Sequence, residues 1–336
     1  MKETIACRKA FSQTLLELAR EDRDLYAVTS DARGSVTLND FAKQLPDQLI
    51  ECGIAEQNEI GVAAGMALAG KKVFVCAPAP FLSARGYEQL KLDVAYNRAN
   101  VKVCGVSGGV SYGTLGTSHH ALQDIASTRS LEGLTVLIPS DGAQTRWLTR
   151  WMARTEGPVY MRMGRNPVPG LYEPDTEFQV GKAMELKAGQ DLSILAAGET
   201  VSIALEAARL LEARGISARV LDLFSIKPLD TEAILKAARE TWAILTVEEH
   251  CVYGGLGGMV AEVVSQSYPV PMTIMGLPDE HTYPGESPDV FRHYNLTPEG
   301  IAKQAQELFG KKQRQIAVMA KFFQQQEKRL TRITED

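Results

Sequence analysis

The hydrophobic positions of the chain form short continuous runs that alternate with longer stretches of helical spacing. In the first half, the runs predict strands at residues 25–29, 49–52, 72–76, 101–106, 134–138 and 159–162. Between them, apolar residues three and four apart predict helices at 4–20, 57–69, 83–97 and 142–155. Continuously apolar strands are typical of sheets that helices cover on both faces. Residues 1–168 are therefore predicted to form a doubly wound α/β domain.

The periodic pattern breaks between residues 166 and 187, where prolines and glycines fall close together, so we interpret residues 169–189 as a linker. A second α/β unit is predicted over residues 190–310, with strands at 192–196, 217–221, 243–247 and 272–275. Its predicted helices are 201–214, 231–241, 257–266 and 297–309, with Asp230 and Thr297 as N-caps. The predicted fold class is thus α/β, with two doubly wound domains in one chain.

The last stretch, residues 311–336, has a different pattern, and we predict a helical tail there. Its apolar residues fall near heptad spacing, at Ile316, Met319, Phe323, Leu330 and Ile333. The tail carries seven basic and three acidic residues. Such a helix can dock on its own subunit, contact a partner chain or fray at its end, and the sequence leaves all three open.

The overall composition narrows the class of function. The 336 residues are 45% hydrophobic and 23% charged, and the net charge of −5 argues against electrostatic binding of nucleic acid. The longest apolar runs are too short to span a membrane, and the first residues lack the apolar core of a secretory signal. The five cysteines are scattered without metal-ligand spacing. We therefore expect free thiols in a cytoplasmic protein and no metal site on this chain.

Three segments of the first domain carry candidate chemistry. Residues 53–65, GIAEQNEIGVAAG, place the acid Glu56 at the head of a helix rich in small residues, where it could also be a surface glutamate stabilised by the helix dipole. Residues 80–87, PFLSARGY, contain the aromatic pair Phe81 and Tyr87. The histidines His119 and His120 follow the strand at 101–106, at the edge of the sheet where α/β proteins bind ligands.

In order and spacing, these segments resemble the pyrimidine-binding half of a transketolase. The resemblance implies thiamine diphosphate as the cofactor, with Glu56 as the acid that hydrogen-bonds N1′ of its aminopyrimidine ring. A buried acid suits this role, because desolvation favours a carboxyl group that shares or donates a proton. Phe81 and Tyr87 match the stacking aromatics of the family, although Ala84 replaces a further aromatic of the pattern.

The resemblance also implies roles for residues around the substrate. His119 matches a family histidine, and a histidine there can exchange a proton with a substrate hydroxyl near neutral pH. His120 takes the position of a glutamine, and Asp31 matches an acid that lies near the cofactor. His119 and His120 are therefore candidate catalytic residues beside Glu56.

Three further residues match the phosphate pocket of the family, namely Arg8, Ser35 and Arg165. Two guanidinium groups and a hydroxyl suit the phosphate end of a sugar phosphate, because charge-assisted bonds to oxyanions are strong and directional. Arg162 is a near competitor for the role of Arg165. The loop after the strand at 101–106 departs from the family pattern, so a sulfonate substrate stays open beside a phosphate. Ser107 replaces a histidine, and Leu115 or a near neighbour replaces an aspartate that reads a substrate hydroxyl.

The second domain resembles the C-terminal domain that transketolases share with deoxyxylulose-phosphate synthases and the beta subunits of 2-oxoacid dehydrogenases. Residues 246–250, TVEEH, and 254–258, GGLGG, carry this likeness. The glycines could cradle an anion at a helix N-terminus. For Glu249 and His250 we expect structural roles.

The other half of a transketolase, with its Gly-Asp-Gly motif for magnesium, has no counterpart in these 336 residues. We therefore interpret the chain as the C-terminal subunit of a split transketolase, which transfers a two-carbon ketol unit from a ketose phosphate to an aldose. An N-terminal partner subunit would bind the diphosphate and most of the Mg²⁺, in an assembly of two copies of each chain, α2β2. Two alternatives are the beta subunit of a 2-oxoacid dehydrogenase and a non-catalytic homodimer that binds a ligand or regulates a partner.

Overall fold

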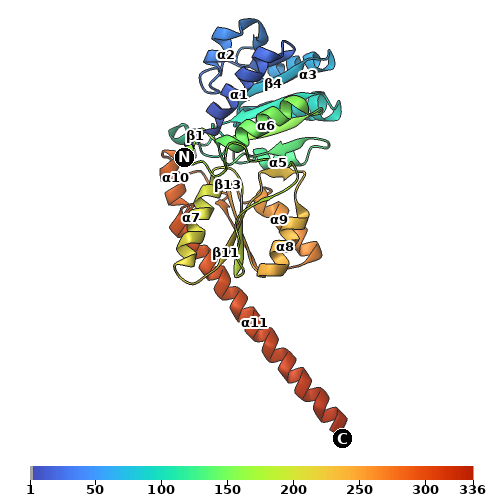
Figure 1. Cartoon of the computed structure of the whole chain (residues 1–336), viewed down its shortest axis with the longest axis vertical. Coiled ribbons are helices and arrows are strands. Elements are labelled where there is room, and N and C mark those ends of the chain that lie inside the picture. Colours follow the sequence, from blue (N-terminus) through green and yellow to red (C-terminus); the bar gives the residue numbers. More distant parts are fainter. Residues whose placement is uncertain (1–2, 336) are drawn as a thin grey trace.

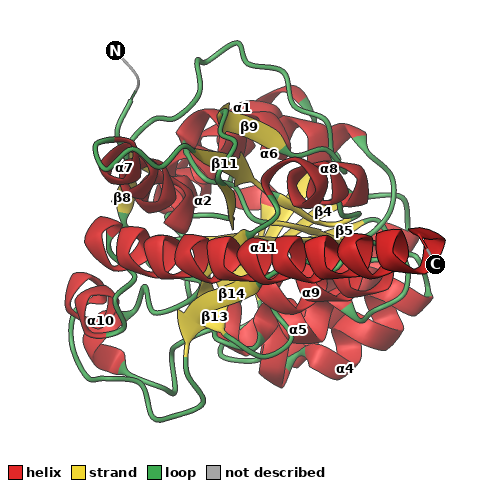
Figure 2. Cartoon of the chain, turned by 90° about the horizontal axis from the view of Figure 1, so that it is seen from below, coloured by secondary structure: helices red, strands yellow, loops and turns green. Residues whose placement is uncertain are grey.

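The computed structural model describes the backbone of residues 3–335 and the side chains of residues 3–322 and 324. Two α/β domains are stacked along the long axis of the molecule (Figure 1). One long helix, α11 (Pro298–Glu335), starts on the second domain and runs away from both. In the view from below, helices surround the strands of the two sheets (Figure 2). This is the doubly wound α/β architecture that the apolar strands predict.

The first domain is built around a seven-stranded sheet with the order β12-β6-β7-β5-β4-β2-β3. Its strands are β2 (Leu25–Thr29), β3 (Leu49–Glu51), β4 (Lys72–Pro78), β5 (Val101–Val106), β6 (Thr135–Leu137), β7 (Val159–Met163) and β12 (Ser225–Lys227). All neighbours pair in parallel except β12, which is antiparallel to β6. The hydrophobic runs predict β2 to β7, but they do not predict β12. This edge strand comes from the second half of the chain and ties the two domains together.

Helices cover both faces of this sheet. The larger ones are α1 (Cys7–Glu21), α3 (Glu56–Leu68), α6 (Gly142–Arg154) and the π-helical segment η3 (Leu90–Tyr96). The shorter elements are β1 (Ile5–Ala6), α2 (Asn39–Gln44), η1 (Pro46–Gln48), η2 (Phe81–Arg85), α4 (Tyr87–Gln89), η4 (Gly113–Leu115), α5 (Asp124–Arg129) and β8 (Pro167–Val168). α1 and α6 belong to one buried cluster with Phe11, Leu15 and Leu148, while α3 and η3 contribute Ile60 and Leu90 to another.

The second domain holds a five-stranded sheet with the order β14-β13-β10-β11-β9. Its strands are β9 (Met184–Lys187), β10 (Leu192–Ala196), β11 (Ala218–Asp222), β13 (Ile244–Cys251) and β14 (Met272–Leu277). Its helices besides α11 are α7 (Thr200–Glu212), α8 (Thr231–Thr241), α9 (Leu256–Ser267) and α10 (Ser287–His293). β10, β11, β13 and β14 lie where they are predicted, whereas β9 is an antiparallel edge strand formed by residues of the predicted linker. Within the described residues, no helix has both the length and the apolarity that crossing a bilayer requires.

Two predicted helix caps in the second domain are confirmed. Asp230 Oδ1 accepts a hydrogen bond from Ala233 N at 3.1 Å, and Thr297 Oγ1 accepts one from Gly300 N at 3.1 Å. Each bond satisfies a backbone donor that the first turn of a helix leaves open.

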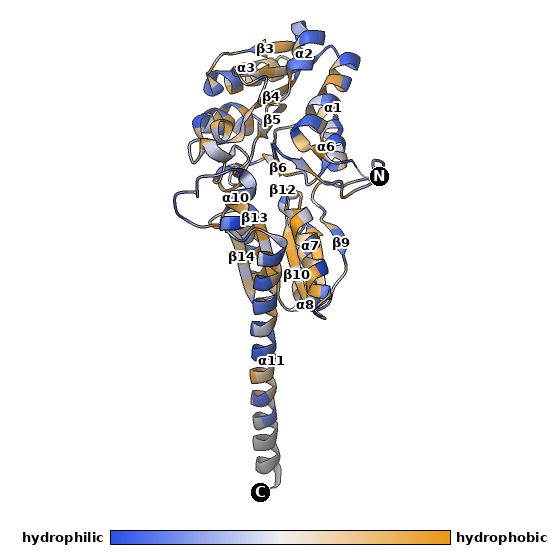
Figure 3. Cartoon of the chain, turned by 90° about the vertical axis from the view of Figure 1, so that its left-hand side faces the viewer, coloured by the Kyte–Doolittle hydropathy of each residue, from blue (hydrophilic) through white to orange (hydrophobic). Residues whose placement is uncertain are grey.

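The predicted tail continues α11 without a break. The first turns of α11 pack on the domain through Ile301, Ala305 and Leu308, and Lys312 Nζ donates to Asp191 O at 2.7 Å. Farther along, the helix stands clear of the body (Figure 3).

Apolar side chains of this projecting part are exposed. Their exposed fractions are 41% for Ile316, 67% for Val318, 50% for Met319 and 54% for Phe322. Docking of the tail on its own subunit therefore does not hold for this stretch. The other heptad positions, Phe323, Leu330 and Ile333, lie outside the described side chains.

The strand order of the first domain brings the candidate residues to one edge. β2, β4 and β5 are parallel neighbours, so their carboxyl ends lie side by side. The segments that follow them carry Asp31 and Ser35, Phe81 and Tyr87, and the histidine pair. β3, at the end of the sheet, leads into α3 and delivers Glu56 to the same edge.

Candidate active site

Glu56 is the first residue of α3, and its side chain is only 3% exposed. Arg85 Nη1 donates a hydrogen bond to Glu56 Oε2 at 2.6 Å. A surface glutamate that is stabilised only by the helix dipole would keep its carboxylate in water. The structure therefore contradicts the surface interpretation and gives the buried acid that the resemblance requires.

The π-helical turn η2 places a flat cation over an aromatic ring. Arg85 follows Phe81 by four residues, and its Cζ lies 4.7 Å from the centroid of the Phe81 ring. Gly86 lets this turn approach α3, because a Cβ there would lie 2.5 Å from Ile60 Cδ1. No role for Arg85 is predicted from the sequence. The four-residue spacing from Phe81 is the signal that identifies it.

His119 connects the aromatic segment to the loop after β5. Its ring packs in T-shaped contacts with Phe81, at a centroid distance of 5.3 Å, and with Tyr112, at 5.4 Å. A cleft of about 570 Å³ opens beside this cluster and is lined by Phe81, Arg85, Tyr87, Thr117, His120 and Gln123 among others. The structure thus brings both predicted aromatic residues to one cleft, together with residues 107–120, here called the histidine loop.

His120 is buried, and its Nε2 lies 3.0 Å from Gly113 O. A carbonyl oxygen only accepts hydrogen bonds, so Nε2 carries the proton. Burial lowers the pKa of His120, which keeps the ring neutral and leaves Nδ1 as an acceptor. Nδ1 has no hydrogen-bond partner among the described residues. His120 therefore holds the loop and offers a single acceptor nitrogen.

Arg8, near the start of α1, links the other two predicted anion-binding residues. Its Nη1 donates to Ser35 O at 2.7 Å, and its Nε donates to Arg165 O at 3.2 Å. The pKa of Arg8 is lowered by burial and then by the Arg165 guanidinium. Arg165 Nη1 is buried without a hydrogen-bond partner among the described residues. Two mutually repelling cations with an unused donor form a suitable pocket for an anion.

Tyr112 joins this anion pocket to His119. The Arg165 Cζ lies 5.1 Å from the centroid of the Tyr112 ring, and the same ring contacts His119. No role for Tyr112 is predicted from the sequence, because its glycine-rich loop departs from the family pattern. Arg162, the competitor of Arg165, is buried in β7, with Nε 3.3 Å from Asp124 Oδ2. Its Nη2 donates to Glu249 O of the second domain at 2.6 Å, so Arg162 is engaged by protein groups and the anion-binding role is proposed for Arg165.

Asp31 lies at the same edge of the sheet with a φ of 53°, a conformation that aspartate tolerates better than most residues. Its backbone N–H donates to Glu51 Oε1 at 2.6 Å, and the same oxygen accepts from Gly53 N at 3.1 Å. These bonds fix the turn that leads to Glu56. The contact of Asp31 with a cofactor stays a prediction.

The glycine-rich segment of the second domain is not an open anion cradle. Glu248 accepts hydrogen bonds from Leu256 N at 2.6 Å and from Gly257 N at 2.9 Å. These are the amides at the start of α9 that an anion would use. The chain therefore fills this helix terminus with its own carboxylate.

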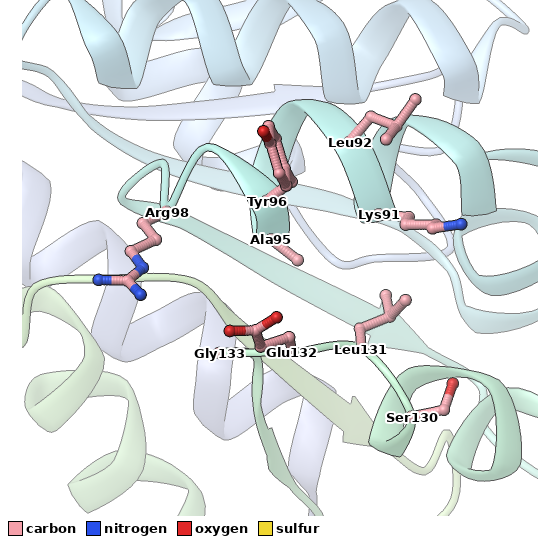
Figure 4. A pocket seen from close by; sticks show the side chains of 9 residues that line it. All are labelled: Lys91, Leu92, Ala95, Tyr96, Arg98, Ser130, Leu131, Glu132 and Gly133. Atoms are coloured by element: carbon pink, nitrogen blue, oxygen red, sulfur yellow. The ribbon is translucent and has the colours of Figure 1, made fainter.

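A separate hollow lies between η3 and the loop of residues 130–133 (Figure 4). It is lined by Lys91, Leu92, Ala95, Tyr96, Arg98 and residues 130–133. Tyr96 and Leu92 are 81% and 44% exposed. None of the candidate active-site residues lines this hollow.

Comparisons with known proteins agree with the sequence and the fold. Residues 3–170 match the family described as transketolase, pyrimidine binding domain, and residues 181–301 match transketolase, C-terminal domain. The chain is 56% identical over 308 residues to an apulose-4-phosphate transketolase subunit of Phocaeicola vulgatus, and the match covers 91% of this chain and 98% of that protein. It is 36% identical over 305 residues to a 6-deoxy-6-sulfo-D-fructose transketolase subunit of a Clostridium species, covering 91% and 95%.

Solved structures lead to the same family. A split gene transketolase, described as an inactive beta4 tetramer, matches with a TM-score of 0.82 at 39% identity, covering 92% of this chain and 99% of that chain. These findings favour a transketolase over the beta subunit of a 2-oxoacid dehydrogenase and over a non-catalytic homodimer. The chain belongs to the transketolase family, as the subunit of a split enzyme that carries the pyrimidine-binding and C-terminal domains.

Proposed function

We propose that this chain supplies the aminopyrimidine site and the anion pocket of a thiamine-diphosphate-dependent transketolase that acts on a ketose phosphate. One observation carries the proposal: the buried Glu56, the Phe81–His119 contact and the Arg8–Arg165 pair lie along one edge of one sheet. A ketol transfer needs these three functions from this half of the enzyme. They are an acid for the cofactor, a proton-transfer group for substrate hydroxyls and cations for the distal anion.

The position of Arg85 supports the fit of an aminopyrimidine. A guanidinium and an aminopyrimidine are both flat, and each can share a proton with a carboxyl group through a nitrogen at its edge. Arg85 stacks on Phe81 and donates to Glu56, which are the two contacts that such a ring would make. We assign the diphosphate and the Mg²⁺ mainly to the partner subunit, following the resemblance.

The residues of this chain have distinct tasks in the proposed reaction. Thiamine diphosphate, when bound, supplies the electron sink for cleavage of a carbon–carbon bond. Glu56 holds the ring nitrogen by a hydrogen bond, and Phe81 and Tyr87 hold the faces of the ring. His119 exchanges a proton with a substrate hydroxyl, and its packing between Phe81 and Tyr112 restricts the orientation of its ring.

The remaining polar groups bind rather than react. His120, neutral with Nδ1 as an acceptor, holds a substrate hydroxyl without protonating it. Arg8, Arg165 and the hydroxyl of Ser35 hold the anionic end of the sugar.

We propose a phosphate rather than a sulfonate at that end. A phosphate monoester carries about −1.5 to −2 charges near neutral pH and so balances two guanidinium groups. A sulfonate carries one charge. The test compares kcat/KM of the enzyme assembled with its partner for apulose 4-phosphate, fructose 6-phosphate and 6-deoxy-6-sulfofructose. Preference for the sulfonate would overturn the phosphate assignment, and no ketol transfer from any of them would overturn the proposed function.

We propose that the partner subunit covers the outer surface of α3 and η3. Four large apolar side chains are exposed around these adjacent helices, namely Ile54, Leu68, Leu92 and Tyr96, with exposed fractions from 44% to 81%. Grouped apolar exposure of this kind marks protein interfaces. The proposed assembly is α2β2 in the cytoplasm. Native mass spectrometry of the co-purified chains with Mg²⁺ and thiamine diphosphate tests it, and a different stoichiometry would contradict it.

Arg85→Met is expected to strengthen cofactor binding to the assembled enzyme by about three- to tenfold, because Arg85 competes for Phe81 and Glu56. The gain is modest, since the Arg85 side chain is 43% exposed and water screens its ion pair. Isothermal titration with thiamine diphosphate measures it, with the exposed Arg214→Met as the control. Weaker binding by Arg85→Met would mean that Arg85 stays beside Glu56 and supports the bound cofactor.

A further inference from the structure

Residue Val110, in the loop after β5, is held by two side chains of the second domain. Glu249 Oε1, at the end of β13, accepts a hydrogen bond from Val110 N at 2.7 Å. Ser287 Oγ, at the start of α10, donates to Val110 O at 3.0 Å. All of these groups are buried. Both backbone polar groups of one residue in the histidine loop are thus fixed from outside the domain that carries the loop.

A second acid of the same domain contacts the loop of residues 164–166, which carries Arg165. Glu199, just before α7, packs against Gly164 so closely that any Cβ at this glycine would collide with its carboxyl group. The backbone of Asn166 also acts on this carboxyl group and lowers its pKa, against the effect of burial. Arg165 follows Gly164 directly, so the contact of Glu199 with Gly164 restricts the backbone beside Arg165.

The two fixed loops meet at one place. Tyr112 follows Val110 by two residues, and its ring touches both His119 and Arg165. A shift of the Val110 backbone would therefore move the ring that His119 and Arg165 pack against. The orientation of the candidate proton donor and of the candidate phosphate ligand depends on contacts made by the second domain.

The buried acidic groups near these two loops outnumber the buried basic groups. Arg162 lies between the two loops; its Nη2 donates to Glu249 O at 2.6 Å, and its Nε lies 3.3 Å from Asp124 Oδ2.

The ionisable groups that act on Glu199, Glu249 or Arg162 are Cys7, Asp124 and Tyr160 from the first domain. On the second domain, Glu248 and His250 flank Glu249 on β13, and Glu286 precedes Ser287. His250 is uncharged near neutral pH, because burial lowers its pKa to about 4.

Three buried acids therefore face one buried cation. Burial raises the pKa of Glu199, and the charge of Glu249 raises it further. Burial also raises the pKa of Glu249, against the effect of Arg162. Glu199 Oε1 has no hydrogen-bond partner among the described residues, which suits a protonated carboxyl group. Because the charge of Glu249 acts on Glu199, the two carboxyl groups lose their protons as a coupled pair.

We propose that Glu249 and Glu199, together with Ser287, are positioning residues through which the second domain sets the geometry of the substrate site. The inference rests on the proposed function for its catalytic consequence. Its structural part, the anchoring of residues 107–113 and 164–166, stands on the contacts above. The second domain is then part of the substrate site, although none of these three side chains lines the cleft beside Phe81.

The proposal predicts a dependence on pH. Groups whose pKa is raised by folding stabilise the native state at low pH, and this stabilisation is lost as the pH rises through the raised pKa. When both carboxyl groups are ionised, Glu199 and Glu249 repel each other beside Asp124, and Arg162 compensates only one charge. The loops are then expected to loosen above neutral pH, and KM is expected to rise there.

The first test uses hydrogen–deuterium exchange on the full chain. Glu249→Ala removes the acceptor of Val110 N–H and should speed exchange in residues 109–113 about tenfold, with little change elsewhere. Glu249→Gln keeps an acceptor oxygen and should retain slow exchange at pH 9, where the wild type loosens. Glu248→Gln is the matched control, because Glu248 is equally buried on the same strand but bonds α9 instead of the loop. If Glu249→Ala does not fold, Ser287→Ala and Glu249→Gln still provide the comparison.

The second test uses the enzyme assembled with its partner. Glu249→Ala and Ser287→Ala should raise KM for the sugar phosphate about tenfold and change kcat less, since they disturb binding geometry. Glu249→Gln should restore KM and flatten its rise at alkaline pH. Unchanged exchange in Glu249→Ala, or a wild-type pH profile in Glu249→Gln, would overturn the proposal. A wild-type assembly without ketol transfer would instead refute the proposed function, and the exchange experiment would still decide whether the loops are anchored in this way.

Discussion

Replacing Glu56 by glutamine is expected to reduce turnover of the assembled enzyme by about 10³-fold or more, with assembly intact. Glutamine has the shape of glutamate but cannot exchange a proton with the cofactor ring. Glu56 is almost fully buried, so no other carboxylate can take its place from solvent. The measurement is kcat with saturating thiamine diphosphate and Mg²⁺, together with native mass spectrometry of the same sample.

Glu59→Gln is the matched control for this experiment. Glu59 lies one turn farther along α3 and is fully buried, and burial raises its pKa to about 8. Its carboxyl group is therefore mostly protonated at neutral pH, and glutamine imitates that form. Activity close to wild type in Glu59→Gln and its loss in Glu56→Gln would assign the acid. Wild-type activity in Glu56→Gln would remove the central residue of the proposed site.

Replacing Arg165 by methionine is expected to raise KM for the sugar phosphate by roughly 10- to 100-fold, because charge-assisted hydrogen bonds to an oxyanion are lost. Arg8→Met should act in the same direction, with added loss of stability, since Arg8 also bonds the backbone of Ser35 and Arg165. The measurement is KM against kcat for each variant. The exposed Arg154→Met, on the outer helix α6, serves as the control.

A comparison of substrates separates binding of the anion from general damage to the site. For a ketose without a phosphate, Arg165→Met should leave kcat/KM nearly unchanged, because the lost charge has no partner there. Arg165→Lys should recover part of the affinity, since a lysine keeps the charge but not the two-pronged geometry. An equal loss for both kinds of ketose would mean that Arg165 supports the loop of Tyr112 rather than the phosphate.

Most of the first domain could be predicted from local pattern. The strands from β2 to β7 are short runs of mostly apolar residues, and such runs can be recognised from consecutive positions. Glu56, Phe81 and His119 could be singled out because each stands in a short motif that resembles the transketolase pattern, in the same order and spacing. Their meeting at one edge follows from the parallel pairing of β2, β4 and β5.

Other parts of the site depend on contacts between residues far apart in the sequence. Arg162 and Arg165 are three residues apart and look equivalent in sequence, yet one pairs with Asp124 in the interior and the other lies on Tyr112. The strand β12 joins a sheet whose other strands end before residue 170. Glu249 accepts a hydrogen bond from the backbone of Val110, which lies 139 residues away in the sequence. Short motifs carry no information on such pairs, because a hydrogen bond between distant residues produces no repeating pattern along the sequence.

By itself, the sequence determined the fold class and the family and singled out Glu56 as the candidate acid, because helical and strand periods and short motifs are local properties. Only the tertiary structure decided that Arg85 lies on Phe81 and that Glu248 accepts hydrogen bonds from the first amides of α9. It also decided that the second domain hydrogen-bonds the histidine loop. Those results depend on which buried charges and donors meet when the domains pack. Packing must satisfy all of them at once, and this requirement acts on the whole chain rather than on any one segment.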